Sequence, residues 1–385
     1  MRIGIDARFL QGPKRGQGQY IYYLIKELLE LGEGNEVVAF YNSLKTGEFA
    51  FDKKTPRLKQ VWCNIPGTFF RKTWPRFQFP PIEHMVGNVD IFHNAANFSF
   101  VHYSPIPCRA PMVATFNGMP DPTTLWHSFD PRKIEAWFVE LAKRASIVIT
   151  VSQIAKKDLM IRSSIPEEKI RIIHYGVSED FLPVSDKRDV NKALSKYGLA
   201  GKRYVLYAGG AEPNKNLETL LNVFSNISKK DGMKDLHLVL AGKIDNFYHS
   251  LVGKVEALGM AQKVVFTDYI GHDDLPLIYN GAEVFISPAH VEPFGIPVLE
   301  AIACGVPTVV STSTGALDVA GDSVISFDPK DPKSMTDALI AVLTNKDLRA
   351  SLVAKGLERA KAMTWKEMAR KTLAVYKEVH AKTKR

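Results

Sequence analysis

The chain has little cysteine and no long apolar segment. Its three cysteines, Cys63, Cys108 and Cys304, stand far apart in 385 residues and show neither CxxC nor metal-ligand spacing, so we expect neither a disulfide framework nor a metal site. No apolar run approaches the ~18 residues of a membrane-spanning helix, and the N-terminal MRIGIDARFL lacks the apolar segment of a signal peptide. A cytoplasmic protein is therefore expected.

Common nucleotide-binding and repeat patterns are also missing. No GxGxxG follows the first strand expected in either half, which disfavours a dehydrogenase, and no Gly-Lys-Ser/Thr follows the glycines near residue 16 as in a Walker loop. The two halves show no sequence repeat, which excludes a solenoid.

The charge is basic but unevenly distributed. The formal net charge is +9, yet residues 183–362 hold 20 basic and 21 acidic residues, so the excess lies toward the two ends of the chain. A basic surface suits nucleic acid, an anionic bilayer, a phosphorylated substrate or solubility alone, and charge does not choose among these partners.

Short β-type runs alternate with amphipathic helical patterns, which predicts βαβ units and parallel sheets. A chain of 385 residues exceeds the usual size of a single core, so we expect two Rossmann-like α/β domains, residues 1–182 and 183–363. The final helix, 364–385, has one apolar face and is expected to pack back on the first domain. The expected strands are 3–6, 36–41, 89–93, 112–116, 147–151 and 170–174 in the first half, and 204–208, 236–241, 264–267, 284–287, 308–311 and 324–327 in the second half.

Two glutamates, Glu292 and Glu300, bracket an otherwise apolar stretch, HVEPFGIPVLEAIACGVPTVV. The expected strand 284–287 runs into a loop there, and Pro297 suits the first position of a helix over 297–304. Ligands of α/β sheets bind beyond the carboxyl ends of the strands, and the amides at a helix N-terminus attract phosphate. The pattern describes a ligand with a diphosphate between two polyols, and a sugar nucleotide fits.

This stretch and its continuation, PVLEAIACGVPTVVSTSTGALDVAGD, resemble the signature of the retaining glycosyltransferases of family 4, which have the GT-B fold. The resemblance implies two domains facing across a cleft, with the donor held mostly by the second. It implies that Glu292 contacts the transferred sugar, that Glu300 holds the ribose hydroxyls, and that the amides of Phe294, Gly295 and Ile296 meet the sugar and the diphosphate. It also implies catalysis without a metal or other cofactor, and no DxD pair stands in a suitable loop.

A second motif is YAGGAEPNKNLETLL, residues 207–221. A strand runs into Gly209 and Gly210, which we expect to line the donor site, and Asn216 is expected to cap the following helix. Lys215 can neutralise the departing diphosphate. The family often has an arginine where Gly210 or Ala211 stands, so Lys215 is expected to act without that partner.

The first half carries a weaker pattern. Gly16, Gln17 and Gly18 precede an amphipathic helix and resemble the family's glycine-rich loop, where phosphate or acceptor groups can meet the helix N-terminus.

Asn117 stands where many family members have a histidine beside the transferred sugar. It can donate a hydrogen bond to a sugar hydroxyl but cannot hold a proton near neutral pH. His93, His102 and His127 lie outside this motif and are expected to be ordinary polar positions.

Two further segments bear on ligands. FTDYIGHDDLPLIY resembles the segment whose backbone, near Tyr269 and Ile270, reads the nucleotide base, with Asp268 in place of the usual glycine. Residues 68–79, TFFRKTWPRFQF, interleave aromatic and basic residues. That pattern suits an anionic membrane, single-stranded nucleic acid, or aromatics tucked into the core. Beside the family resemblance, a bilayer carrying a lipid-linked acceptor is preferred.

The sequence thus predicts a retaining glycosyltransferase with Glu292, Lys215 and Asn117 as catalytic residues. We expect it to move a hexose, with GDP-mannose as the favoured donor, to a glycan or lipid-linked acceptor in surface polysaccharide synthesis, without a nucleic acid partner. The expected location is the cytoplasm, including the inner face of the cell membrane. The alternatives are a nucleotide-sugar epimerase of similar fold, for which no acid and base can be placed, and a nucleic-acid-binding protein using residues 68–79.

Overall fold

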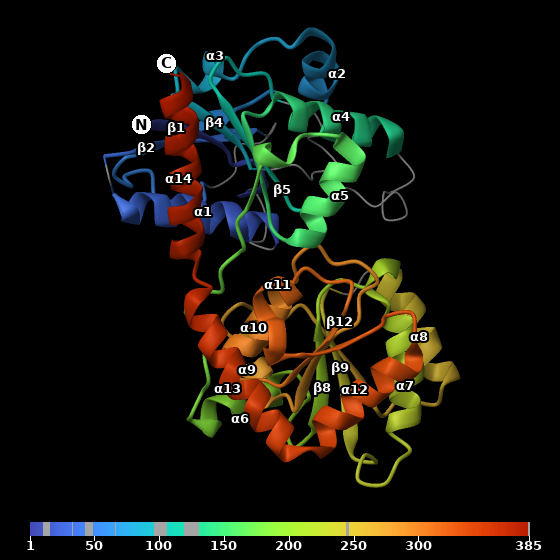
Figure 1. Ribbon diagram of the computed structural model, residues 1–385. Helices are drawn as coiled ribbons and strands as arrows, with labels where there is room; N and C mark the ends of the chain where they lie inside the picture. Colours follow the sequence, from blue (N-terminus) through green and yellow to red (C-terminus); the bar gives the residue numbers. More distant parts are fainter. Residues whose placement is uncertain are drawn as a thin grey trace. The chain divides into compact units, whose positions relative to one another are not determined.

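The computed structural model describes residues 1–10, 16–32, 34–42, 49–65, 67–95, 106–118, 131–243 and 246–383. The chain divides into two compact units (Figure 1). Met1–Tyr175 and Trp365–Arg385 form the first unit, and Gly176–Thr364 form the second unit. Each unit is built on one parallel β-sheet with helices packed against it, which confirms the predicted α/β class with two Rossmann-like units.

The sheet of the first unit has the strand order β3-β2-β1-β4-β5-β6-β7, and every pairing is parallel. Its strands are β1 (Arg2–Asp6), β2 (Glu36–Asn42), β3 (Leu58–Cys63), β4 (Ile91–Asn94), β5 (Met112–Phe116), β6 (Ile147–Thr150) and β7 (Ile170–Ile172). Its helices include α1 (Gln17–Leu31), α2 (Gly67–Phe77), α3 (Glu83–Val86), α4 (Pro131–Arg144), α5 (Gln153–Ser163) and α14 (Trp365–Thr383), with 3₁₀ turns at η1 (Arg8–Leu10) and η2 (Glu167–Lys169).

The sheet of the second unit has the order β10-β9-β8-β11-β12-β13, again parallel throughout. Its strands are β8 (Arg203–Ala208), β9 (Leu236–Ala241), β10 (Val264–Asp268), β11 (Val284–Ser287), β12 (Thr308–Ser311) and β13 (Ile325–Phe327). Its helices include α6 (Lys187–Lys196), α7 (Leu217–Ile227), α8 (Asn246–Ala257), α9 (Leu275–Gly281), α10 (Ile296–Ala303), α11 (Leu317–Ala320), α12 (Pro332–Thr344) and α13 (Lys346–Ala362), with 3₁₀ turns at η3 (Pro213–Lys215) and η4 (Gly321–Ser323).

Each predicted strand is present, but β3 was not predicted. In the part of the chain that the structure describes, β3 is an edge strand that pairs with β2 alone, and only its end residues, Leu58 and Cys63, are buried. An edge strand with polar residues such as Lys59 and Gln60 lacks the continuous apolar run by which central parallel strands are recognised.

The boundary between the two units falls after Tyr175, earlier than the predicted 182/183 boundary. Val177 forms a β-bridge with Thr364, and the ring of Phe181 lies edge-on to Tyr279, with centroids 5.8 Å apart. The segment from Val177 to Phe181 is therefore packed within the second unit.

The C-terminal helix α14 lies against α1 and β4 of the first unit (Figure 1). The ring of Trp365, its first residue, stacks on Tyr23 with centroids 4.9 Å apart and an interplanar angle of 3°. The side chains on its apolar face are buried: Trp365, Met368, Ala369, Thr372, Leu373, Val375, Tyr376 and Val379.

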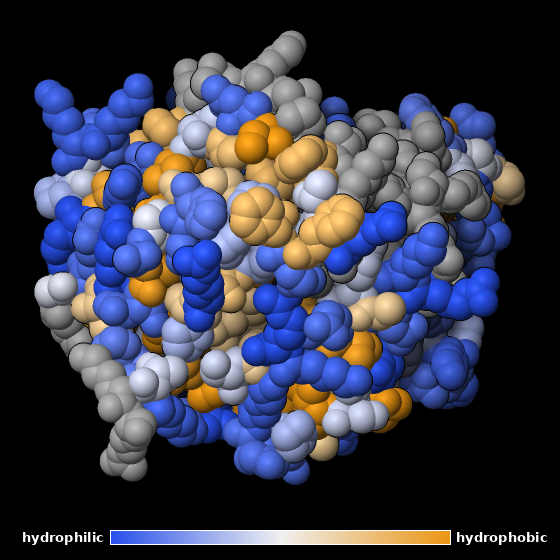
Figure 2. Space-filling view, turned by 90° about the horizontal axis from the view of Figure 1, so that it is seen from above, coloured by the Kyte–Doolittle hydropathy of each residue, from blue (hydrophilic) through white to orange (hydrophobic). Residues whose placement is uncertain are grey.

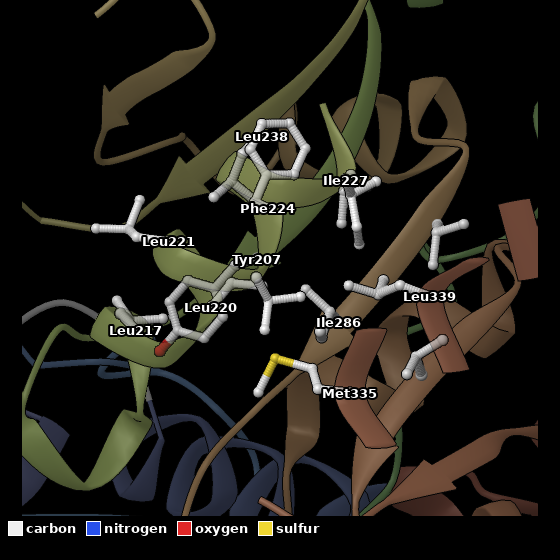
Figure 3. Packing of buried hydrophobic residues seen from close by; sticks show 14 of the residues in the cluster. Tyr207, Leu217, Leu220, Leu221, Phe224, Ile227, Leu238, Ile286, Met335 and Leu339 are labelled. Carbon is white, nitrogen blue, oxygen red and sulfur yellow. The ribbon is translucent and has the colours of Figure 1, made fainter. Parts of the chain in front are cut away.

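The core of the second unit lies between the sheet and the helices α7 and α12 (Figure 3). Apolar side chains of α7 such as Leu220 and Phe224 are fully buried against β8 and β9. Tyr207 of β8 lies among these side chains with its hydroxyl oxygen at the margin of the cluster, near Leu217. This core fixes β8 and β11 as neighbours, so the loops at their carboxyl ends lie close together.

Candidate active site

The glutamate motif occupies the loop after β11 and the start of α10. The helix begins at Ile296, one residue earlier than predicted, so Pro297 is its second residue. Gly295 precedes it with a left-handed φ of +88°, and a Cβ there would lie 3.3 Å from both Ala316 Cβ and Thr314 Oγ1. Both the conformation and the close packing favour glycine at this position. The amides of Gly295 and Ile296 thus open a helix at the edge of the sheet where α/β proteins bind ligands.

Glu292 is held at this edge through its backbone and its side chain. Its N–H donates to the Ser313 carbonyl at 3.2 Å, and its carbonyl accepts from the Gly315 N–H at 2.8 Å. Its carboxylate accepts a hydrogen bond from the ammonium of Lys215, with Nζ and Oε2 2.5 Å apart. Lys215 ends η3, in the loop after β8. The two expected catalytic residues of the second unit therefore form one ion pair, which the sequence did not predict.

The environment of this pair favours a charged lysine. Burial alone would lower the pKa of Lys215, but the negative charge of Glu292, its hydrogen bond and the charge of Glu212 outweigh burial and raise that pKa. One carboxylate oxygen of Glu212, Oε2, is buried without a hydrogen-bond partner among the described residues.

Glu300 is buried, with only 6% of its surface exposed. It faces α9, where the Tyr279 hydroxyl donates to its Oε2 at 3.0 Å. Burial raises the pKa of Glu300 to about 7, against a smaller lowering by the Tyr279 hydrogen bond. A carboxyl group of this kind changes its protonation state near neutral pH. Phe294, before the helix, is also buried.

Asn216 precedes α7 as predicted, but its side chain does not cap that helix. Its Nδ2 donates instead to the carbonyls of Pro288 at 3.1 Å and Pro329 at 3.0 Å. The residue has a left-handed φ of +60°, which asparagine tolerates better than most residues. Asn216 thus ties the loop after β8 to the loop after β11.

Tyr269 and Ile270 follow β10, which is the edge strand of the second sheet and is separated from β11 by β9 and β8. Tyr269 is exposed and Ile270 is buried. Asp268, where the family usually has glycine, has a φ of +56°. A left-handed backbone suits the glycine that the family usually has at this position. Aspartate is one of the few other residues that adopt this conformation.

In the first unit, Asn117 follows β5. The Tyr175 hydroxyl donates to its Oδ1, while its Nδ2 is buried and has no partner among the described residues. An unused buried donor fits the predicted hydrogen bond to a sugar hydroxyl.

The glycine pattern of the first unit lies at the start of α1. Gly16 precedes the helix with a φ of +48°, and Gln17 and Gly18 are its first two residues. Gln17 Oε1 is buried without a partner among the described residues. Residues 11–15 lie outside the described part of the chain.

His93 lies in the interior of the first unit and belongs to a hydrogen-bond network. Its Nδ1 is 2.5 Å from the Tyr376 hydroxyl of α14, and its Nε2 is 2.8 Å from Thr115 Oγ1. Burial lowers its pKa to about 3, so the ring is neutral at ordinary pH. His102 and His127 lie outside the described residues.

Comparison with known proteins places these features in a family. The model of "Glycosyltransferase Family 4" matches residues 14–181, and that of "Glycosyl transferases group 1" matches residues 189–359. The chain is 30% identical over 408 aligned residues to O-antigen chain mannosyltransferase B of Escherichia coli, covering 98% of this chain and 100% of that protein.

Solved structures agree on the fold. Sucrose-phosphate synthase from Thermosynechococcus elongatus superimposes with a TM-score of 0.77 at 20% identity, over 99% of both chains. Anabaena HepE in complex with UDP and glucose gives a TM-score of 0.74 at 16% identity, over 98% of this chain and 100% of that one. The fold is that of the GT-B glycosyltransferases. The chain belongs to glycosyltransferase family 4, and it is a glycosyltransferase.

Proposed function

We propose that the protein is a retaining, metal-independent mannosyltransferase that uses GDP-mannose and acts on a glycan or lipid-linked acceptor in surface polysaccharide synthesis. The observation that carries the proposal is the Lys215–Glu292 ion pair beside the glycine that opens α10. Mannose is supported by the full-length likeness to an O-antigen chain mannosyltransferase. A nucleoside diphosphate is supported by the shared fold of HepE, which was solved with UDP and glucose.

The roles follow from the chemistry of each group. Lys215 stabilises the charge that develops on the departing diphosphate, and the amides at the start of α10 bind the phosphates. Glu292 binds and orients the mannosyl hydroxyls. Glu300 accepts hydrogen bonds from the ribose hydroxyls. In the first unit, Asn117 donates its free amide hydrogen to a sugar hydroxyl.

Transfer assays with purified GDP-mannose, UDP-glucose and other sugar nucleotides test the proposal, with the anomeric configuration of the product read by NMR. We expect Glu292→Gln and Lys215→Ala each to abolish transfer while leaving the circular dichroism spectrum unchanged. Lys333→Ala is the matched control, since Lys333 forms an ion pair with Asp337 on the exposed surface of the same unit, also at 2.5 Å. Full activity of either site variant, an inverted product, or loss of activity in EDTA would contradict the corresponding part of the proposal.

The second part of the proposal concerns the membrane. Residues 67–77 form α2, an amphipathic helix in which Phe70 and Trp74 are buried. Phe77 and Phe79 are 64% and 59% exposed, and the guanidinium of Arg76 lies 5.4 Å from the centre of the Phe77 ring. Figure 1 has α2 near the top of the first unit, and Figure 2, which is seen from above, shows apolar side chains in orange among hydrophilic ones in blue on that face. Phe70 and Trp74 are thus tucked into the core, which was one of the three predictions for this stretch, whereas Phe77 and Phe79 are exposed.

We propose that this face lies on an anionic bilayer, where exposed aromatics insert and nearby cations bind lipid phosphates. In the described residues, no helix is long and apolar enough to cross a bilayer. Cosedimentation with vesicles containing anionic lipid measures the association. Replacing Phe77 and Phe79 by serine should reduce it, whereas Ile161→Ser, at an 80% exposed apolar position on α5, should not. Equal binding of all variants would overturn the membrane proposal.

A further inference from the structure

Both carbonyl groups of the Gly209–Gly210 pair accept hydrogen bonds from buried tyrosines. The hydroxyl of Tyr248, on α8, donates to the Gly209 carbonyl at 3.1 Å. The hydroxyl of Tyr207, the second-last residue of β8, donates to the Gly210 carbonyl at 2.5 Å. Burial first, and then nearby negative charges, raise the pKa of Tyr207 far above its usual value. Its hydroxyl therefore stays protonated and remains a donor at any pH the protein meets.

The backbone around Gly209 is fixed from two further sides. Gly209 has a φ of +154°, which few residues other than glycine adopt, and its N–H donates to the Ala241 carbonyl at 2.9 Å. The loop after β9 approaches so closely that a Cβ on Gly242 would lie 1.9 Å from the Gly209 carbonyl oxygen. The pair is thus held rigidly between β8, β9 and α8.

The amides that follow are left without partners. Among the described residues, the N–H groups of Gly210 and Ala211 donate no hydrogen bond. They lie in the same loop as Lys215, at the carboxyl end of β8. The nearest atoms to a Cβ on Gly210 would be the carboxylate oxygens of Glu212, at 2.3 and 2.7 Å, so a side chain at position 210 would require the Glu212 side chain to turn away. Beside the ammonium of Lys215, the backbone amides of Gly210 and Ala211 are thus the donors that this loop offers.

We propose that Tyr248 and Tyr207 are positioning residues: by binding the two glycine carbonyls, they hold the amides of Gly210 and Ala211 ready to bind the diphosphate of the donor. The inference rests on the proposed function, since it assigns these amides to the diphosphate of a sugar nucleotide. Rigid amides bind an anion well because they need no rearrangement when it arrives.

The test compares Tyr248→Phe with a matched control, Tyr204→Phe. Tyr204 lies on the same strand as Tyr207 and is fully buried, and its hydroxyl donates to the Ile278 carbonyl at 2.6 Å. Both variants lose one buried tyrosine-to-carbonyl hydrogen bond, so their effects on folding should be similar. Titration calorimetry then gives the affinity of each protein for GDP, which carries the second phosphate, and for GMP, which lacks it.

We expect Tyr248→Phe to weaken GDP binding about threefold to tenfold, the size of one net hydrogen bond, and to leave GMP binding nearly unchanged. Tyr204→Phe should leave the preference for GDP over GMP as it is in the unaltered chain. The double variant, Tyr207→Phe with Tyr248→Phe, should reduce this preference more than Tyr248→Phe does alone. If the unaltered protein prefers GDP but Tyr248→Phe keeps the same preference, the inference is wrong and the proposed function stands. If the unaltered protein does not distinguish GDP from GMP, the nucleotide assignment itself fails.

Discussion

Glu300 should make the stability of the second unit depend on pH in an unusual direction. Burial raises its pKa from 4.5 to about 7, so ionising it in the folded chain costs about 3 kcal/mol more than in the unfolded chain. Between these two pH values the folded state binds more protons than the unfolded state. The free energy of unfolding therefore falls as pH rises from 4.5 to 7, and it remains lower above pH 7.

Glu300→Gln removes this dependence. A glutamine oxygen can still accept the Tyr279 hydrogen bond, but it never carries a charge. We expect the variant and the unaltered protein to have similar free energies of unfolding near pH 4.5. Above pH 7 the variant should be more stable by up to about 3 kcal/mol.

Urea unfolding at several pH values measures the difference. All five tryptophans fall within the residue ranges of the first unit. Tryptophan fluorescence therefore follows that unit alone and serves as the internal control, whereas far-UV circular dichroism follows both units. Parallel stability curves for the variant and the unaltered protein would refute the reasoning, because they would mean that Glu300 ionises as it does in water.

The same carboxyl group links nucleotide binding to pH. In the proposed function a ribose hydroxyl donates to the Glu300 carboxylate, so below pH 7 the nucleotide can bind in this way only when Glu300 loses its proton. The affinity for GDP should therefore fall by up to tenfold for each pH unit below about 7. Glu300→Gln should remove this slope, and a 2′,3′-dideoxy nucleotide should remove it in the unaltered protein. A slope that survives in the variant would assign the proton to another group.

Three further changes test single features of the two units. Gly295→Ala forces a φ of +88° on a residue with a Cβ, and we expect a loss of about 1–2 kcal/mol in thermal unfolding together with weaker GDP binding. Asn216→Gly keeps the left-handed backbone but removes the amide that donates to Pro288 and Pro329, and urea unfolding should show a loss of about 2 kcal/mol. Burial lowers the pKa of His93 from 6.5 to about 3, so between these pH values the unfolded chain binds one proton more than the folded chain. The free energy of unfolding should therefore fall by up to about 1.4 kcal/mol per pH unit as the solution is acidified from pH 6.5 toward pH 3. His93→Gln should make that fall shallower when it is followed by tryptophan fluorescence.

The sequence predicted the central strands well because parallel strands buried on both faces read as continuous apolar runs. Leu236–Ala241, Val284–Ser287 and Thr308–Ser311 were predicted with the observed ends. The amphipathic α2 was missed because its proline and clustered aromatics hide the helical spacing of Phe70 and Trp74. These two buried side chains, four residues apart, are the signal that could have indicated the helix.

The site was predicted as separate residues but not as an arrangement. Lys215 and Glu292 are 77 positions apart and meet only because β8 and β11 are neighbours in the sheet. Strand order is a property of the whole topology, and no local pattern in the sequence reports it. For the same reason, the partnership of Glu300 with Tyr279 and the positions of Tyr207 and Tyr248 could be found only in the structure.

The ion pair also indicates how donor binding proceeds. In the proposed function Lys215 binds the diphosphate and Glu292 binds the sugar, yet in the structure each is the partner of the other. A diphosphate must therefore compete with Glu292 for Lys215, and the released carboxylate then becomes free to bind mannosyl hydroxyls. The two side chains are only 20% and 23% exposed, so the cost of removing both charges from water offsets most of their attraction, and we take the net attraction as about 1 kcal/mol. Glu292→Gln should accordingly bind GDP about fivefold more tightly than the unaltered protein while losing transfer. Calorimetry with GDP checks this expectation, and weaker binding by Glu292→Gln would show that Glu292 contacts the nucleotide itself and does not compete with it.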